Sequence, residues 1–420
     1  MGASSRHVAI IGGGVVGLCT ARALIRRGFE VTLVEPEPVV GQIASRANGG
    51  QLSYHYVSPM AGAGVPVQAI AWLLRGEDGI ALRLRLDPAQ WRWLAGFLAA
   101  CRSGANRRGG ARLLRLALLS RDQLRDWRLE GLDGFCWSAS GKLVLHRDAA
   151  SFRKAAQSLL MPEAQQVLSA AECAALEPAL ATITPALAGG IHTRADETAD
   201  CHLFCQALLR DLLCQPGFRL LRGTARIEPD PAGDRTCRIL TGDGPLQADL
   251  FVLAAGLQSA GLMRDAGFYL PLLGLKGYSL TAGTHPGMSG RLPAISITDY
   301  DRKTVYAPLG DRFRIAASIE IGSTAPSPTP RKIDALRREA AGNFPGAADY
   351  ENATPWAGFR PATPDGLPIL GPSPWRNLLL NVGHGSLGFT LAAGCAAVVA
   401  ALAANEPSPI PLDVMTLYAR

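Results

Sequence analysis

The chain has 420 residues, of which 48% are hydrophobic and 18% are charged, and its formal net charge is +7. These values are typical of a globular protein and exclude a chain that is disordered over long stretches. The length indicates two domains, or one domain with a large insertion.

The predicted elements begin with a β-α-β unit. Short apolar runs over Val8 to Ile11 and Glu30 to Val34 predict two strands, and Val15 to Arg26 between them has helical character. Such a unit has a right-handed crossover and starts a parallel sheet that helices cover. From Pro59 to Glu130 the sequence turns helical, with Trp and Arg and few β-branched residues.

The rest of the chain alternates between strands and helices. Asp200 is the predicted N-cap of a helix over Cys201 to Cys214, and Arg331 to Ala341 predicts another helix. A terminal helix follows the turn GHGSLG. The predicted strands are Lys142 to His146, Phe218 to Glu228, Cys237 to Thr241, Ala248 to Ala254, Leu378 to Asn381 and, in a second and antiparallel sheet, Tyr278 to Thr281, Val305 to Ala307 and Phe313 to Ala317.

This order of elements predicts an α/β fold with two domains that are interleaved along the chain. We expect a Rossmann-type nucleotide domain with a parallel sheet, built from residues 1–58, 147–272 and 352–420. Residues 59–146 and 273–351 are expected to form an α+β substrate domain with a mixed or antiparallel sheet.

A glycine motif marks the nucleotide site. Gly12-x-Gly14-x-x-Gly17 follows the first predicted strand, and Glu35 ends the next one. The first glycine permits a tight turn, the second lets the backbone approach a pyrophosphate, and the third lets helix and strand pack closely. Glu35 can accept hydrogen bonds from ribose hydroxyls and repels a 2′-phosphate, which disfavours NADP.

Two further glycine-rich turns distinguish FAD from NAD. Ala47 to Gln51 (ANGGQ) and Gly383 to Gly388 (GHGSLG) lie on either side of the nucleotide motif in the fold we expect. Glycines let the backbone lie against a flat ring, and Asn48, Gln51 and His384 add polar groups. A flavin needs contacts along its whole length, so these turns favour FAD.

The nine cysteines include no CxxC pair and no Cys/His cluster with metal-ligand spacing. We therefore expect free thiols in a reducing compartment and no metal site. The N-terminus lacks the design of a signal peptide, and the most apolar stretch, Phe389 to Ala403, is shorter than the ~20 residues that span a bilayer. We expect a cytoplasmic protein, attached at most peripherally to the inner face of a bacterial plasma membrane.

Positive charge is concentrated between Arg75 and Arg128. This segment has twelve arginines and five acidic residues, so its excess of seven positive charges equals the net charge of the chain. Such a segment can rest on anionic lipid or, less readily, face nucleic acid. The alternative is ordinary amphipathic helices with arginine on the solvent side. The tryptophans near or within this segment are Trp72, Trp91, Trp93 and Trp127.

Several motifs together resemble the D-amino-acid oxidase superfamily of FAD-dependent oxidoreductases, and most closely bacterial D-amino-acid dehydrogenases of the small-subunit type. The resemblance extends from about Val8 to Ala403. The motifs are IGGGVVG at Ile11 to Gly17, ANGGQLS at Ala47 to Ser53, GVP at Gly64 to Pro66, ADETADC at Ala195 to Cys201, LKGYSLT at Leu275 to Thr281, GFRPATPDGLPILG at Gly358 to Gly371 and NVGHGSLGFT at Asn381 to Thr390.

The resemblance implies FAD as the cofactor and assigns residues to it by position. Gly12, Gly14, Gly17 and Glu35 match the ADP contacts of the family. The other FAD-binding residues that we expect are Val15, Val16, Ser45, Asn48, Gly50, Gln51, Ala255, Gly256, His384, Gly385, Ser386, Leu387 and Gly388.

Arg360 is the main candidate for substrate binding. It lies in GFRPATPDGLPILG, where three prolines and three glycines fix the backbone path. A guanidinium matches a carboxylate in two parallel hydrogen bonds, and the family uses this position to hold the substrate carboxylate. The alternative is a salt bridge to Asp365 that locks the turn.

Four more residues are candidates for contacts with the substrate or the flavin ring. Tyr278 could add a hydroxyl to the carboxylate, and Lys276 could stabilise a reduced anionic flavin; as alternatives, both are ordinary strand residues. Tyr54 and His55 could line the pocket. His384 is expected to be a neighbour of the flavin rather than a base.

Two departures from the family pattern bear on the substrate. The usual S-P-G-Y is Ser53-Tyr54-His55-Tyr56 here, and the usual glycine before the DET acids is Ala195. The two tyrosines and the histidine leave open a narrower substrate, such as a D-proline or hydroxyproline derivative.

The resemblance implies oxidation of a D-amino acid by hydride transfer from Cα to flavin N5, which gives an imine and then a 2-oxo acid and ammonia. A quinone-type acceptor is expected to take the electrons. The alternatives are an oxidase that uses oxygen, a D-proline or D-hydroxyproline dehydrogenase, and a subunit of a hetero-oligomeric glycine or opine dehydrogenase.

Overall fold

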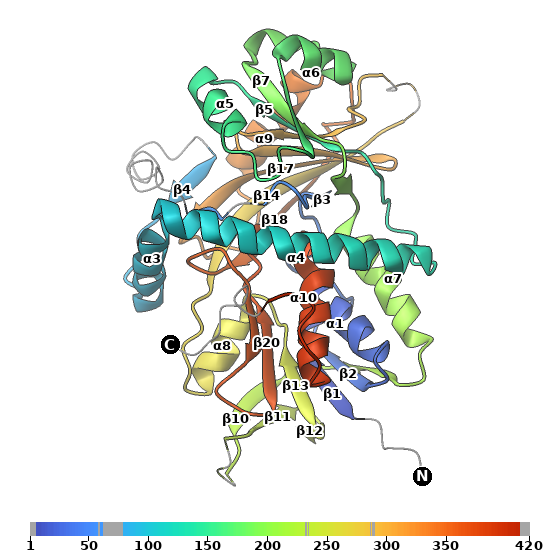
Figure 1. Cartoon of the computed structure of the whole chain (residues 1–420), viewed down its shortest axis with the longest axis vertical. Helices are drawn as coiled ribbons and strands as arrows, with labels where there is room; N and C mark the ends of the chain where they lie inside the picture. The colour runs from blue at the N-terminus through green and yellow to red at the C-terminus, as the bar shows by residue number, and fades with distance from the viewer. Residues whose placement is uncertain are drawn as a thin grey trace.

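The computed structural model describes residues 6–57, 59–61, 79–231, 233, 235–285, 287 and 290–411, except for the side chain of Ser103 (Figure 1). Trp72, Arg75 and the GVP motif at Gly64 to Pro66 lie outside the described residues.

A six-stranded sheet forms the nucleotide domain. Its strand order is β19-β20-β13-β1-β2-β9, and all neighbours are parallel except β19, which runs antiparallel to β20. The strands are β1 His7–Ile11, β2 Glu30–Glu35, β9 Phe218–Arg222, β13 Leu250–Leu253, β19 Ile369–Pro372 and β20 Leu378–Val382.

Helices pack on one face of this sheet, and one of them comes from the far end of the chain. They are α1 (Val15–Ile25), α7 (Cys201–Leu213) and α10 (Gly388–Ala403), whose apolar side chains share one core with β1 and β2 (Figure 1). The predicted N-cap of α7 is confirmed, because the Asp200 carboxylate accepts from the backbone N–H groups of His202 and Leu203. The other face of the sheet carries α8 (Gln258–Asp265) and a small antiparallel sheet of β10 (Arg226–Pro229), β11 (Cys237–Thr241) and β12 (Gly244–Leu246).

The long helix α4 (Ser103–Leu129) crosses the molecule and packs on α10 (Figure 1). The two helices approach closely at Gly394, where a Cβ atom would lie 2.6 Å from the carbonyl oxygen of Leu116. The stretch Gly385–Ala403 is long and apolar enough to span a membrane by composition, but 78% of it is buried inside the protein. Its apolar character is therefore explained by packing between α1 and α4.

A nine-stranded mixed sheet forms the other domain. Its order is β18-β14-β17-β16-β15-β5-β7-β6, with β4 paired to β17, and the pairs β15–β5 and β17–β4 are parallel. The helix α9 (Pro330–Asn343) packs on one face. The strands are β4 Ile80–Leu82, β5 Lys142–His146, β6 Gln165–Leu168, β7 Gly189–Thr193, β14 Leu273–Gly283, β15 Ser296–Asp299, β16 Thr304–Leu309, β17 Arg312–Ile321 and β18 Thr354–Ala362.

Short elements connect these layers. The strand β3 (Gln51–Leu52) pairs with β8 (Glu197–Thr198), and two single-turn helices follow α6. The remaining helices are α3 Pro88–Ala100, α5 Ala149–Ala156, α6 Ala170–Leu176, η1 Pro178–Leu180, η2 Thr184–Ala186 and η4 Gly385–Leu387.

The fold class agrees with the prediction, but the chain crosses between the domains at other positions. β6 and β7 were expected in the nucleotide domain, within residues 147–272. In the structure β7 pairs with β5, and β6 pairs with β7, so both belong to the nine-stranded sheet. β18, expected within residues 352–420, also belongs to that sheet, whereas α4 packs against the nucleotide domain. The predicted strand Phe218 to Glu228 is broken at Gly223 into β9 and β10 of two sheets. These boundaries depend on which distant strand each strand pairs with, and local patterns carry no such information.

Candidate active site

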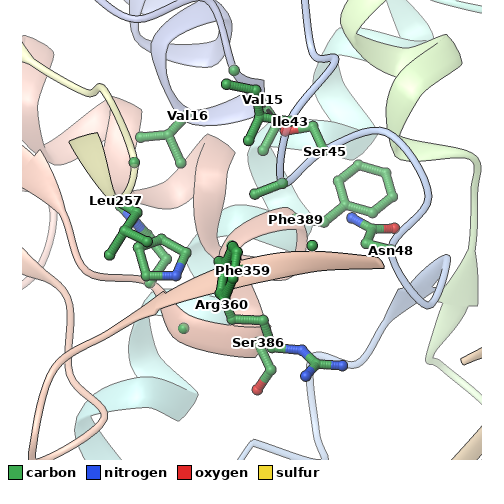
Figure 2. A pocket seen from close by; sticks show the side chains of 18 of the residues that line it. Val15, Val16, Ile43, Ser45, Asn48, Leu257, Phe359, Arg360, Ser386 and Phe389 are labelled. Carbon is green, nitrogen blue, oxygen red and sulfur yellow. Dashed lines mark hydrogen bonds between the residues drawn. The ribbon is translucent and has the colours of Figure 1, made fainter. Parts of the chain in front are cut away.

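One cavity, with a volume of about 1270 Å³, is lined by residues of both large sheets (Figure 2). Its size exceeds that of a site for a single small molecule. Of the residues predicted to bind the cofactor, all except Gly17 line it. Of the predicted catalytic residues, Arg360 and Tyr278 line it, whereas Lys276, Tyr54 and His55 do not.

The turn between β1 and α1 leaves no room for side chains. Gly12 has φ +111°, and a Cβ there would lie 2.6 Å from the carbonyl oxygen of Ala254. A Cβ at Gly17 would overlap the carbonyl oxygen of Gly12, so Gly17 packs the helix against the turn instead of facing the cavity. Gly14 is the N-cap of α1 and offers no side chain, so the positive end of the helix dipole is open to a phosphate.

Glu35, at the end of β2, is buried and lines the same end of the cavity. Its two carboxylate oxygens accept from the backbone N–H groups of Gly13, at 2.5 Å, and Glu37, at 2.9 Å. These bonds fix the carboxylate while leaving each oxygen a further lone pair, so Glu35 can accept from ribose hydroxyls.

The segment from Ser45 to Gln51 is tied to both domains. The Ser45 hydroxyl accepts from the N–H of Val15 at 3.2 Å, and the carbonyl of Ala47 accepts from Ser279 at 2.8 Å. The carbonyl of Asn48 accepts from Arg314 at 2.7 Å, and the Asn48 side chain accepts from the N–H of Gly50. The backbone of this segment is therefore held against the cavity at both ends (Figure 2).

The turn before α10 lines the cavity with His384, Gly385, Ser386 and Leu387. Gly383 and Gly385 have φ values of +82° and +55°, which favour glycine. His384 is buried, and burial lowers the pKa of its imidazole to about 4, so the ring is neutral at pH 7. Its Nε2 has no hydrogen-bond partner among the described residues, and the same holds for Oδ1 of the nearby Asn381. Both atoms belong to residues that line the cavity.

Arg360 lies on β18 and faces the cavity from the nine-stranded sheet (Figure 2). Its Nη1 donates to the carbonyl of Ser318 at 3.1 Å, and burial lowers the pKa of the guanidinium to about 10. The described residues give it no ion pair. Asp365 instead accepts from the N–H of Leu367 at 3.1 Å, so the described structure does not contain the alternative salt bridge.

A bulge in β17 supplies the carbonyl that Arg360 contacts. The β14–β17 register shifts between Lys276 and Tyr278, and Ser318 has φ +67°. An extra residue in one strand of an antiparallel pair redirects the backbone locally. The bulge thus leaves the Ser318 carbonyl free to orient the guanidinium.

Tyr278 lines the cavity but its hydroxyl is engaged by other residues, whereas Lys276 lies outside the cavity lining. Tyr278 belongs to the core under α9, and its hydroxyl bonds to Glu320 at 3.0 Å and Thr329 at 2.9 Å. Lys276 is buried and donates to the carbonyl of Ser327 at 2.7 Å. The predicted roles at the carboxylate and at the flavin ring are therefore not supported, and the alternative of ordinary strand residues describes them.

Tyr54 and His55 lie in a buried polar network behind the cavity. The Tyr54 hydroxyl donates to Glu197 at 3.1 Å, and Nδ1 of His55 lies 2.9 Å from Oδ1 of Asp196. The same Asp196 oxygen accepts from the backbone N–H groups of both residues. They do not line the pocket, contrary to the prediction, and they hold the chain after β3 in place. The alternation of polar residues in SYHY did not reveal which of them point inward.

Comparisons with known proteins identify the family. Residues 7–402 match the family described as FAD dependent oxidoreductase. The chain belongs to this family. D-amino acid dehydrogenase 2 of Pseudomonas aeruginosa is 52% identical over 407 residues, which cover 97% of each chain. D-amino acid dehydrogenase 2 of Ralstonia nicotianae is 40% identical and covers 96% of this chain and 98% of its own.

Solved structures share the fold of this FAD-dependent oxidoreductase. Glycine oxidase from Geobacillus kaustophilus has a TM-score of 0.75 at 22% identity, over 99% of this chain and 100% of its own. Iminodiacetate oxidase from Chelativorans sp. BNC1 has a TM-score of 0.72 at 23% identity, over 98% of both chains. At these identities the likeness concerns the fold.

The residues that line the cavity fit FAD. The glycine turn, the open helix N-terminus and Glu35 suit an ADP group. The unpartnered atoms of Asn381 and His384 are polar partners that a bound group could satisfy, because buried polar atoms are rarely left without hydrogen bonds. The volume accommodates a dinucleotide together with a small substrate.

Sequence reasoning missed Lys142 as a cavity residue. It is buried on β5, and its Nζ donates to Ser53 at 2.7 Å and to Gln51 at 3.1 Å. Its Nζ also lies 4.7 Å from the ring centre of Tyr56, and burial lowers its pKa to about 8. The strand KLVLH was predicted with its correct bounds. The lysine in this otherwise apolar strand was the feature that could have indicated a buried, functional side chain. The other cavity residues that we did not predict include Asp299, Lys303 and Trp356.

Proposed function

We propose that this protein is a D-amino-acid dehydrogenase, which oxidises the Cα–N bond of a D-amino acid or D-imino acid. The product is an imine, which water hydrolyses to a 2-oxo acid and ammonia. The observation that carries this proposal is the guanidinium of Arg360, which faces the cavity and forms no ion pair with a described residue.

Arg360 binds and orients the substrate. With Nη1 engaged by the Ser318 carbonyl, the remaining N–H groups are available to the α-carboxylate of an amino acid. A carboxylate held in this way fixes the position of Cα, and such positioning supplies a large part of the rate.

FAD, when bound, supplies the two-electron oxidant that takes the hydride from Cα. Residues of the chain itself surround the reacting groups. The neutral His384 can take part in a hydrogen bond without adding charge, and the rigid Ser45–Gln51 segment closes the cavity from the side of the nucleotide domain. The substrate amine must be unprotonated for its lone pair to form the C=N bond.

The names of the relatives support the substrate class. The two relatives above are D-amino acid dehydrogenases, and the structural neighbours act on glycine and iminodiacetate, which also carry an amine next to a carboxylate. The narrower substrate, a D-proline derivative, was suggested by Tyr54, His55 and Tyr56. Of these three residues only Tyr56 lines the cavity, so the narrower substrate stays an alternative that rests on Tyr56 alone.

The acceptor in this proposal is a quinone. The relatives are named dehydrogenases rather than oxidases, which favours an acceptor other than oxygen. In the cell, we place the protein in the cytoplasm, in peripheral contact with the membrane that holds the quinone.

An anaerobic flavin-reduction assay tests the proposal. The purified protein is expected to be yellow and to bleach with one or more D-amino or D-imino acids in a panel, but not with the L-enantiomers. Reoxidation by a quinone analogue should then be much faster than by oxygen. Bleaching by L-enantiomers alone, or a folded protein that binds no flavin, would refute the proposal.

A further inference from the structure

The helix α3 and the four residues Arg83 to Leu86 before its N-cap expose apolar side chains on the surface. Trp91 is 48% exposed and Leu98 is 53% exposed, and Leu84 and Leu86 are also exposed. We call these four side chains the α3 face. Scattered exposed apolar residues are common, but a group of them on one short segment marks a contact site.

The α3 face is built on an amphipathic helix that is firmly attached to the protein. Its inner side buries Trp93 and Phe97, whose rings stack at 5.2 Å, and Nε1 of Trp93 donates to the carbonyl of Ala362 at 2.8 Å. The outer side carries Trp91, Ala95, Leu98 and Ala99, all of which are exposed. Packing in the core therefore explains why the inner side of α3 is aromatic. It does not explain the apolar side chains on the outer side.

The charge around this face is mainly positive. Residues 83–102 contain four arginines, at positions 83, 85, 92 and 102, and one acidic residue, Asp87. Asp87 N-caps α3 and lies 3.9 Å from Arg85. The guanidinium of Arg92 lies 5.5 Å from the ring centre of Tyr269. An apolar strip that arginines flank is complementary to a surface with an apolar interior and anionic head groups.

The basic helix α4 lacks an exposed apolar strip, although the sequence analysis grouped it with α3. Its apolar side, which includes Leu116 and Trp127, is buried in the core. Arg121 and Arg125 pair with Asp122, and the guanidinium of Arg128 stacks on the ring of Trp137. The alternative of an ordinary amphipathic helix therefore describes α4 better. Of the described residues among the four tryptophans that we named, Trp93 and Trp127 are buried and Trp91 is exposed.

The α3 face lies beside the substrate end of the cavity. The strand β4 leads directly into residues 83–86, and Ile80 at its start lines the cavity. On the other side, Trp93 contacts Ala362, which ends the strand that carries Arg360. In Figure 1, α3 projects at the left edge of the molecule, beside β4 and beyond the end of α4.

We propose that the α3 face docks on the surface of an anionic lipid bilayer, with Trp91, Leu98, Leu84 and Leu86 in the head-group layer and the arginines on anionic lipids. Docking there brings the substrate end of the cavity to the membrane. The proposal rests on the proposed function in one respect, because a quinone acceptor resides in the bilayer.

Vesicle flotation tests the docking without turnover. The purified flavoprotein is mixed with vesicles of phosphatidylcholine alone, or of phosphatidylcholine with 30% phosphatidylglycerol. The wild type should float with the anionic vesicles, and high salt should weaken this binding because it screens the arginines. The Trp91→Ser/Leu98→Ser variant should lower the partition coefficient at least about tenfold, since two apolar side chains no longer insert. Arg85→Ser and Arg92→Ser should each lower it about fivefold.

Matched variants elsewhere on the surface act as controls. Leu129 and Leu213 are also exposed, so Leu129→Ser/Leu213→Ser should change flotation less than about twofold. Arg226→Ser and Arg264→Ser control for the loss of charge, because both side chains are highly exposed. All variants should keep wild-type activity with a soluble dye, while the α3 variants lose activity with a quinone embedded in vesicles.

Three results would overturn the docking proposal. They are no flotation of the wild type at low salt, equal losses in the control variants, and a change of oligomeric state in Trp91→Ser/Leu98→Ser, which would assign the face to a second copy of the chain. A protein that bleaches with D-amino acids but does not float refutes only the docking. A protein that floats through α3 but does not bleach refutes only the proposed function.

Discussion

The guanidinium of Arg360 lies directly against Gly277 on the neighbouring strand. A Cβ atom at Gly277 would overlap Cζ and both Nη atoms of Arg360. The two residues are close in the β14–β18 ladder, where Gly277 pairs with Gly358 and Leu275 pairs with Arg360. The absence of a side chain on β14 therefore creates the space in which the arginine lies.

Gly277→Ala is expected to displace the guanidinium while leaving the flavin bound. Misplacing an anchoring group by about 1 Å can cost ~100-fold in rate, so we expect kcat/KM to fall by up to about 100-fold. Steady-state kinetics with the best D-amino acid and the flavin-to-protein ratio measure the two effects.

Gly283→Ala in the same strand is the matched control, because a Cβ at Gly283 would have nothing within 4 Å. It should leave the kinetics unchanged. Equal losses in the two variants would indicate a general weakening of β14 rather than displacement of Arg360.

Arg360→Ala should remove the carboxylate anchor and keep the flavin. Losing one partner of a buried charge pair costs about 2–5 kcal/mol, which corresponds to about 30- to 5,000-fold in kcat/KM. Most of the effect should be in KM, and stopped-flow flavin reduction at rising substrate concentration measures it.

Arg360→Lys should recover only part of the loss, because an ammonium cannot form the two parallel bonds of a guanidinium. Arg226→Ala, at an exposed position, should behave as the wild type. If Arg360→Ala had normal kinetics, the arginine would have a structural role.

Lys142 makes the stability of the protein depend on pH in the alkaline range. Its pKa is lowered from 10.5 to about 8 by burial, so between these values the unfolded chain binds a proton that the folded chain does not. Stability therefore rises with pH through this window, and the cost of burying the charge is fully present below pH ~8.

Comparison with Lys142→Met isolates this effect. The free energy of unfolding of the wild type should gain about 3 kcal/mol relative to the variant between pH 8 and 10.5, from a pKa shift at ~1.4 kcal/mol per unit. Urea unfolding of both proteins across this range measures it. Lys154→Met, at an exposed lysine, should show no such trend. A constant difference between wild type and Lys142→Met would mean that Lys142 stays charged in the folded protein.

The parts of the fold that local patterns determine were predicted well. The β-α-β opening, the Asp200 cap and β5 depend on neighbouring residues, and the structure has them at or close to the expected positions. The domain boundaries failed at β6, β7 and β18, because their positions depend on pairing across long distances in the chain.

The residues of the candidate site were likewise predicted correctly only where local spacing determines their role. Glycines that a turn or close approach requires, such as Gly12, can be recognised from their spacing. The direction of a side chain on a strand could not be predicted at β14, where a one-residue difference decides between the cavity face and the α9 face. Lys276 therefore looked like a site residue but lies outside the cavity lining, and Gly277 next to it is the position that contacts Arg360.

The order of strands in the six-stranded sheet has a consequence for biosynthesis. β20 completes the sheet next to β13, and α10 fills the space between α1 and α4, yet both come from the last tenth or so of the described chain. A ribosome-bound chain that lacks them leaves the edge of β13 and the apolar side of α1 uncovered. The nucleotide site can thus form only after β20 and α10 have left the ribosome, and chaperones have a long interval in which to bind the unfinished domain.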